Sequence, residues 1–132
     1  NYCKSVLIEA NTMVDMAKTQ IAPAVSAYAS ELARTSAAKK ALDSALACGY
    51  ETELVRKLSA LTDRIYDGAV AVENSLLSLA AAEDIGEEAA LIRDQVLAGM
   101  GELRVACDEA ETLTAKRYWP YPSYGDLLFS VQ

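Results

Sequence analysis

The chain has 132 residues, of which 52% are hydrophobic and 7% aromatic, and its formal net charge at pH 7 is −7. The length fits one domain, and the many alanines with few aromatic residues favour an all-α fold. The negative charge disfavours nucleic-acid binding, since no basic stripe is present to replace backbone counterions. No apolar run is long enough to cross a membrane, and three cysteines without a CxxC pair fit a reducing cytoplasm.

The first predicted helix covers about residues 2–48. Its apolar stripe comprises Leu7, Ala10, Val14, Ala17, Ile21, Ala24, Tyr28, Leu32, Leu42 and Leu46. Pro23 predicts a kink or break near residues 19–23, because it removes a backbone hydrogen bond and crowds the preceding turn. Gly49 is expected to follow the helix with a positive φ. Unbroken, this helix would be about 70 Å long, so we expect its part before Pro23 to reach beyond the bundle.

The second predicted helix covers about residues 51–82. Its stripe comprises Leu54, Leu58, Leu61, Ile65, Val72, Leu76 and Leu79. Gly68 and Ala69 interrupt this row of large side chains. Because small residues permit close packing, we expect a neighbouring helix to approach most closely there.

The third predicted helix covers about residues 85–117, and Asp84 with Glu87 forms a capping-box pattern at its start. Its stripe comprises Ile85, Ala89, Ile92, Val96, Gly99, Leu103, Ala106, Ala110 and Leu113. Short connections make neighbouring helices antiparallel. Residues 1–118 are therefore expected to form an up-down-up three-helix bundle.

The sequence offers few groups for catalysis or for metal binding. Histidine is absent, which removes the usual general base and the commonest nitrogen ligand for metals. Carboxylate pairs such as Asp108 with Glu111, or Glu83 with Glu87, could hold a hard cation, but such pairs are common on acidic helices. We predict no catalytic, cofactor-binding or metal-binding residue in this chain.

The sulfur-containing residues fit packing better than chemistry. Cys48 and Cys107 lie on or near core stripes, where a buried thiol acts as a small hydrophobe. Met13 and Met16, together with Ile21, have two interpretations: a partner-binding face, or the commoner role of filling the core.

A tail of aromatic residues and prolines, residues 119–132, follows the bundle. Pro120 and Pro122 bias the backbone toward an extended form, so the aromatic side chains project from a stiff segment. The predicted interaction residues are Trp119, Pro120, Tyr121, Pro122, Tyr124, Leu127, Leu128 and Phe129. Two alternatives remain open: the tail covers a seam of its own bundle, or it docks on another domain or subunit, where Trp and Tyr are typical anchors.

The tail carries a family resemblance. Its stretch "RYWPYPSYGDLLF", residues 117–129, resembles the end of type III glutamine synthetases. The preceding "ELRVACDEAETLTAKRYWPYP" is also similar, and "EANTMVDMAKTQIAPAVSAY" near the start resembles the helix that follows the catalytic core in that family. Residues 35–85 contribute little to the resemblance.

The resemblance implies an ATP-dependent ligase that joins glutamate and ammonium, uses Mg²⁺ or Mn²⁺, and assembles as stacked hexameric rings. The family's ATP-binding and metal-binding residues lie in the preceding catalytic region, so no position of this chain corresponds to them. We therefore expect a non-catalytic, cytoplasmic C-terminal domain that packs on its own catalytic domain or on neighbouring subunits of a homo-oligomer.

The charge pattern supports an alternative function, a stand-alone acidic helical module that binds a regulatory protein. Between Glu83 and Glu111 the chain has nine acidic residues against two arginines, Arg93 and Arg104. Such a face would attract a basic partner, and the attraction would weaken with salt.

Overall fold

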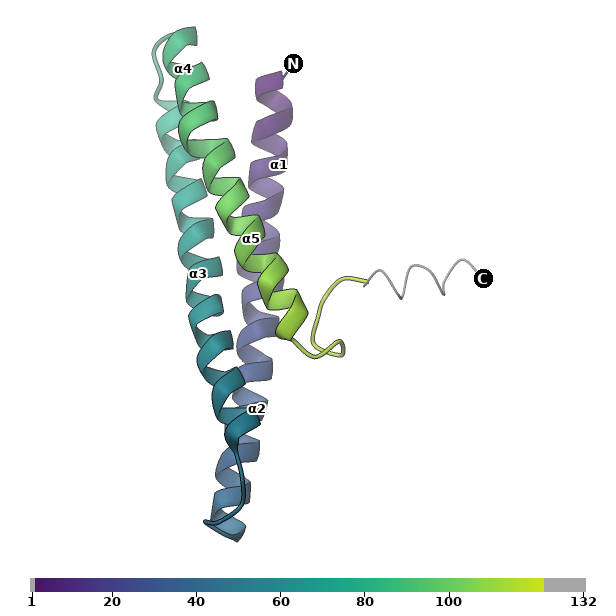
Figure 1. Ribbon diagram of the computed structural model, residues 1–132. Helices are drawn as coiled ribbons and strands as arrows, with labels where there is room; N and C mark the ends of the chain where they lie inside the picture. Colours follow the sequence, from purple (N-terminus) through teal and green to yellow (C-terminus); the bar gives the residue numbers. More distant parts are fainter. Residues whose placement is uncertain (1, 123–132) are drawn as a thin grey trace, which may run out of the picture.

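The computed structural model describes residues 2–122, and this range contains helices, turns and loops but no strand. The predicted all-α class is confirmed for these residues. Figure 1 shows the long helical rods side by side, with the second rod returning beside the first and the third descending again. The first rod is α1 (Tyr2–Met16), η1 (Ala17–Ile21) and α2 (Ala22–Leu42); the second is α3 (Gly49–Ala80); the third is α4 (Ile85–Leu91), η2 (Ile92–Val96) and α5 (Leu97–Leu113).

The first rod stays helical through Pro23. The segment η1 is a π turn, in which the Ala22 N–H donates to the Ala17 carbonyl oxygen five residues earlier. Pro23 follows at the start of α2. A proline ring crowds the carbonyl four residues before it, and a wider turn relieves that crowding. The rod does not break at Pro23, and the irregularity predicted near residues 19–23 as a kink or break is a single π turn.

A second π turn, η2, lies in the third rod, where the Leu97 N–H donates to the Ile92 carbonyl oxygen. No proline marks this turn, and the sequence pattern did not predict it. Ile92 and Val96, at its two ends, are both buried. The added residue in the turn thus keeps the apolar side of the rod toward α3 and the first rod.

The first helix ends at Leu42 and not at residue 48 as predicted. The Asp43 carboxylate accepts a hydrogen bond from the Ala45 N–H at 2.9 Å, and the Lys40 ammonium donates to the Ser44 carbonyl oxygen. These local hydrogen bonds compete with continued helix. Leu42, expected on the core stripe, is 83% exposed.

Gly49 is also placed differently from the prediction. It begins α3 instead of following the first helix, and no glycine among the described residues has a positive φ. Across this connection the Lys39 ammonium lies 2.9 Å from the carboxylate of the buried Glu51. This ion pair joins the end of α2 to the start of α3, and it lowers the pKa of Glu51.

The start of the third rod is confirmed as predicted. The Asp84 carboxylate accepts a hydrogen bond from the Glu87 N–H at 2.7 Å, and the Glu87 carboxylate accepts one from the Glu83 N–H at 3.1 Å. Two amide groups that lack partners within the helix are satisfied in this way.

The third rod ends at Leu113, before the predicted end at residue 117. Thr114 is extended, with φ −88° and ψ 132°. The chain then forms a turn in which the Tyr118 N–H donates to the Ala115 carbonyl oxygen at 2.9 Å. The early end of the helix lets this turn bring Tyr118 against α2, a contact that continued helix would not make.

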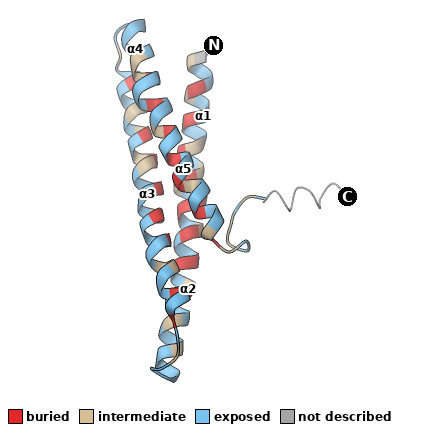
Figure 2. Ribbon diagram, viewed as in Figure 1, coloured by how far each residue is buried: buried red, intermediate tan, exposed pale blue. Residues whose placement is uncertain are grey.

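The core lies along the seam between the three rods, where Figure 2 shows the buried residues. The largest fully buried side chains are those of Val25, Leu58, Ile65, Val72, Val96 and Leu103. Residues of α1 also belong to this core, including Val6, Ala10 and Val14. The prediction that the chain before Pro23 reaches beyond the bundle is therefore wrong.

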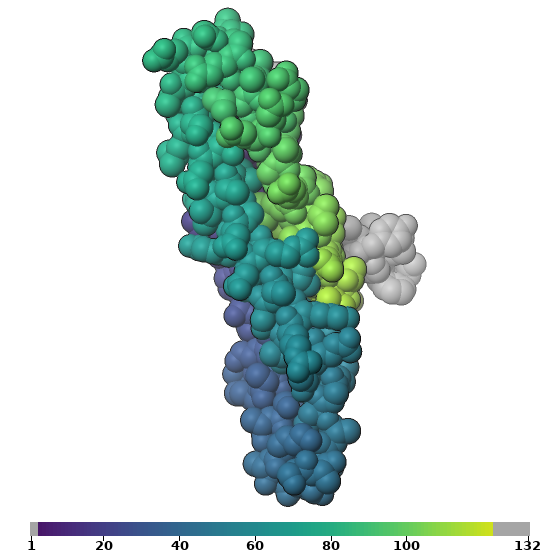
Figure 3. Space-filling model, turned by 60° about the vertical axis from the view of Figure 1, so that its left-hand side comes forward, coloured from purple at the N-terminus to yellow at the C-terminus, as the bar shows by residue number. Residues whose placement is uncertain are grey.

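The end of the molecule at which α2 connects to α3 lacks a third rod. The last turns of α2 and the first turns of α3 extend beyond the end of α5, as Figures 1 and 3 show. Nearly all residues from 33 to 42 are exposed or partly exposed. A two-helix extension therefore projects below the three-rod core.

Helices α3 and α5 approach each other closely at two glycines. A Cβ built on Gly68 would lie 3.3 Å from Leu103 Cδ1, and one built on Gly99 would lie 3.2 Å from Val72 Cγ2. The predicted close packing at Gly68 is thus confirmed. Gly101, also in α5, has nothing within 4 Å of such a Cβ.

Because Gly68 and Gly101 have different surroundings, we expect replacement by leucine to have opposite effects on stability at the two positions. We predict that Gly68→Leu lowers the free energy of unfolding by about 1–3 kcal/mol, because the added side chain has no room against Leu103. Gly101→Leu is the matched control and should raise it by about 0.5–1 kcal/mol, through better helix propensity. Urea denaturation followed by circular dichroism measures both. Equal effects of the two substitutions would contradict the described packing.

Candidate functional site: the C-terminal strap and two apolar grooves

The strap, which we define as residues 117–122, is attached to the bundle through aromatic and charged contacts. The rings of Tyr118 and Tyr28 have centroids 5.4 Å apart and are tilted by 39°. The Arg117 guanidinium lies 5.2 Å from the Tyr118 ring centroid and 5.8 Å from that of Tyr28. It also pairs with the Glu31 carboxylate. The first two residues of the strap, Arg117 and Tyr118, are thereby fixed on α2.

The start of α3 contributes to the same cluster. The hydroxyls of Tyr28 and Tyr50 are hydrogen-bonded at 3.1 Å. This hydrogen bond, with burial, raises the pKa of Tyr28 to about 12. The Tyr28 ring therefore stays neutral near pH 7 and presents an uncharged aromatic face to Arg117.

Beyond its first two residues, the strap lies partly on the bundle. Trp119 and Tyr121 are half-buried and pack against the hydrophobic core, while Pro120 and Pro122 are exposed. The Tyr121 hydroxyl is enclosed and has no hydrogen-bond partner among residues 2–122. Burial raises the pKa of Tyr121, and the nearby Asp15 carboxylate adds to this effect.

The structure therefore brings four predicted interaction residues, Trp119 to Pro122, together beside the bundle. The other four, Tyr124, Leu127, Leu128 and Phe129, lie outside the described residues. Of the two alternatives for the tail, contact with its own bundle holds for Trp119 and Tyr121.

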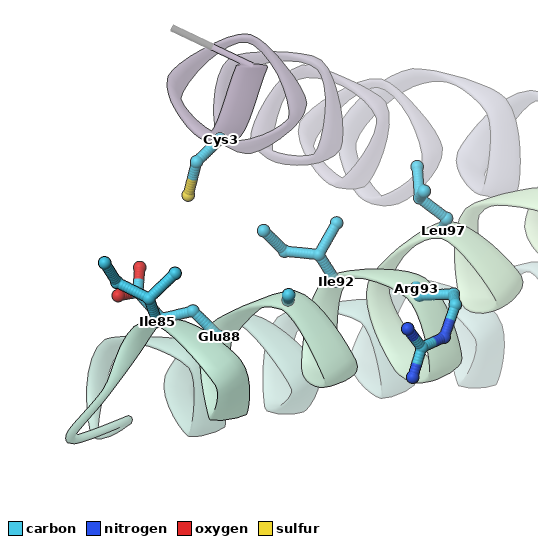
Figure 4. Close-up of a pocket in the computed structure, with 7 residues that line it drawn as sticks. Cys3, Ile85, Glu88, Ile92, Arg93 and Leu97 are labelled. Carbon is cyan, nitrogen blue, oxygen red and sulfur yellow. The ribbon is translucent and has the colours of Figure 1, made fainter.

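An apolar groove lies between the start of α1 and the third rod. It has a volume of about 600 Å³. Figure 4 shows Ile85 and Ile92 facing Cys3 across it, with Leu97 farther along. Ile85 is 83% exposed, although the sequence pattern placed it on a core stripe. We call this the N-terminal groove; the apolar stripes of the sequence did not predict it.

A second groove, of about 510 Å³, lies between α1 with η1 and α5. All three methionines of the chain line it, namely Met13, Met16 and Met100. Ile8 and Arg104 also line it. We call it the methionine groove. Met13 and Met16 were considered as a partner-binding face from the sequence, but Met100 was missed because periodicity within one helix does not show which helices meet.

Cys107 lies at the edge of the methionine groove. Burial raises the pKa of its thiol to about 11. The thiol is therefore protonated near neutral pH and is a weak nucleophile. Cys48 is buried, and both Cys48 and Cys107 are free thiols. These features agree with the predicted packing role of Cys48 and Cys107.

In residues 2–122, no group of three or more His, Cys, Asp or Glu side chains is placed to hold a metal ion. Within the same range, no helix is long and apolar enough to cross a membrane.

Comparison with known proteins gives a family match. The family model for the glutamine synthetase C-terminal domain matches residues 1–40. A glutamine synthetase from Butyrivibrio fibrisolvens is 30% identical over 132 residues, which is 100% of this chain and 19% of the relative. No solved structure gives a significant match.

These matches confirm the predicted resemblance to the C-terminal domain of glutamine synthetases. A second relative, the type-3 glutamine synthetase of Dictyostelium discoideum, is 25% identical over 97% of this chain and 18% of its own length. The chain is thus similar to a type-3 enzyme as well. It spans about a fifth of the length of each of these two relatives.

Attachment of the strap can be followed with Trp119, the only tryptophan. We predict that Tyr118→Ala shifts Trp119 fluorescence to longer wavelength and increases its quenching by acrylamide, because the strap loses its contact with Tyr28. Tyr66→Ala, at an exposed tyrosine of α3, is the matched control and should leave the emission unchanged. An unaltered spectrum in Tyr118→Ala would show that this ring does not hold the strap.

Proposed function

We propose that this chain is a non-catalytic structural domain of a glutamine synthetase, an antiparallel up-down-up bundle that packs on the catalytic region or on a neighbouring subunit of a homo-oligomer. The observation that carries the proposal is its similarity, from end to end, to about a fifth of two glutamine synthetases. In this proposal the parent protein is cytoplasmic and forms stacked hexameric rings. Its other parts bind ATP and Mg²⁺ or Mn²⁺ and perform the ligase reaction.

The strap and the tail after it are the first proposed contact. Trp119 and Tyr121 keep part of their surface exposed although they already lie on the bundle. Covering 100 Å² of apolar surface contributes about 2.5 kcal/mol before ordering costs. The stiff backbone at Pro120 and Pro122 keeps those costs low. The proposed contact residues are Trp119, Pro120, Tyr121, Pro122, Tyr124, Leu127, Leu128 and Phe129.

The N-terminal groove is the second proposed contact. The matched family domain is C-terminal by name, so in our proposal the catalytic region of the parent protein precedes α1. Its chain would then enter the bundle beside Cys3, which lines the groove. The exposed Ile85 is placed to receive an apolar side chain from that region. Contacts at the groove and at the strap would hold the bundle at two separated points.

We predict that the double variant Trp119→Ala/Phe129→Ala, made in a full-length protein that carries this domain, loosens the oligomer or lowers turnover. The physical reason is the loss of two large apolar anchors. Leu77→Ala is the matched control, since Leu77 is 70% exposed on α3 and lines neither groove. Analytical ultracentrifugation and a glutamine-formation assay measure the two effects. Unchanged assembly and turnover in the double variant would contradict the proposal.

A second candidate function is docking of a basic regulatory protein on the acidic third rod. Arg64 pairs with Glu109, and Arg93 with Asp94. Other acidic residues of α5 are exposed, namely Glu102, Asp108 and Glu111. A partner held by this charge should bind at low ionic strength and dissociate as salt is added. Recovery of no partner at low ionic strength would count against this candidate.

A further inference from the structure

The methionine groove lies in the direction in which the strap runs. Tyr118 contacts Tyr28 in α2, whereas three residues later Tyr121 lies near Asp15 in α1 and Cys107 in α5. The strap therefore runs toward the start of the first rod, opposite to α5. Cys107 also lines the methionine groove. A chain that continues in the same direction would pass along this groove.

The apolar side chains and Arg104 of the groove complement the sequence after the strap. The groove offers three methionine side chains, and Ile8 in its wall is 68% exposed. Arg104, which also lines the groove, makes no ion pair with any residue from 2 to 122. The sequence that follows is Asp126, Leu127, Leu128 and Phe129. An acidic residue before three large apolar residues matches a cation beside a methionine-lined surface, and sulfur contacts with an aromatic ring are favourable.

The length of the chain is sufficient. The seven residues that follow Pro122, up to Phe129, span up to about 23 Å when extended. The groove runs along α1 from Met16 to Ile8, which is about 12 Å of helix. The tail is therefore longer than the part of the groove that runs along α1.

We propose that Leu127, Leu128 and Phe129 dock in the methionine groove of their own bundle, with Asp126 beside Arg104. The docked tail closes the apolar seam between α1 and α5. Tethering through the strap gives the tail a high effective concentration at the groove. Leu127, Leu128 and Phe129 are also proposed above as assembly contacts, so docking in the groove applies to the chain outside the assembled protein, while Pro120, Pro122 and Tyr124 stay available in both states. The docking is internal to the chain, so it does not rest on the proposed function.

The methionines provide a direct test, because all three line the groove and Phe129 is the only phenylalanine. We predict nuclear Overhauser effects between the Phe129 ring protons and at least one methionine methyl group in the 132-residue chain labelled with ¹³C-methyl methionine. The same methyl resonance should be shifted upfield by the aromatic ring. Phe129→Leu keeps an apolar side chain and should abolish this shift.

Two further variants separate docking from a general disturbance. Ile8→Asp alters the groove wall at an exposed side chain and should abolish the Overhauser effects without unfolding the chain. Leu77→Asp, at an exposed leucine of α3, is the matched control and should leave them intact. Methionine methyl resonances that are the same in wild type and Phe129→Leu, with no Overhauser effect, would overturn the proposal.

A mixed sample of differently labelled chains tests whether the tail of a second copy of the chain occupies the groove instead. Overhauser effects found only between chains, and rising with concentration, would overturn docking within one chain. Either negative result leaves the assembly proposal standing, because that proposal is measured on the full-length oligomer.

Discussion

The contact between Gly68 and Leu103 determines how closely α5 approaches α3, and the position of the strap depends on it. Gly99 and Val72 repeat the same arrangement nearer to α4. Because both contacts use glycine, the helix backbones come close and leave little freedom for α5 to slide or rotate. The end of α5 is then fixed relative to α2. This placement brings Tyr118 onto Tyr28 and leaves Tyr121 packed against the core.

The two π turns give the long rods their fit to one core. In the first rod, Ile21 and the adjacent Ala22 are both buried, which shows that the buried side of the helix changes phase there. In the third rod, Ile92 and Val96 at the two ends of η2 are both buried, so the buried side of the helix changes phase there too. The methionine groove begins beside η1, since Ile21 lines it. The irregular turns therefore serve both the core and the groove.

Much of the fold follows from local patterns. The spacing of Leu58, Leu61, Ile65 and Val72 predicts one buried side of α3, and these residues are buried. The capping pattern of Asp84 and Glu87 correctly predicts where the third rod begins, because both hydrogen bonds form within one turn.

Other features depend on tertiary contacts or on competing local hydrogen bonds, and periodicity did not show them. The first helix ends early because Asp43 bonds to a nearby amide, and the third ends early where Tyr118 meets α2. Ile85 fits the stripe of the third rod but lies beside a groove that α1 does not fill. The methionine groove combines residues about 85 positions apart in sequence, such as Met13 and Met100. Eight interaction residues were predicted, and the described structure places four of them, Trp119 to Pro122.

The central claim is that this bundle is a structural part of a larger glutamine synthetase. The most direct measurement is hydrogen–deuterium exchange of the bundle alone and of the same residues within a full-length parent protein. The account predicts slower exchange in the parent at the strap, at the N-terminal groove, or at both, because the catalytic region or a neighbouring subunit covers them. Identical exchange of all peptides in the two samples would contradict it.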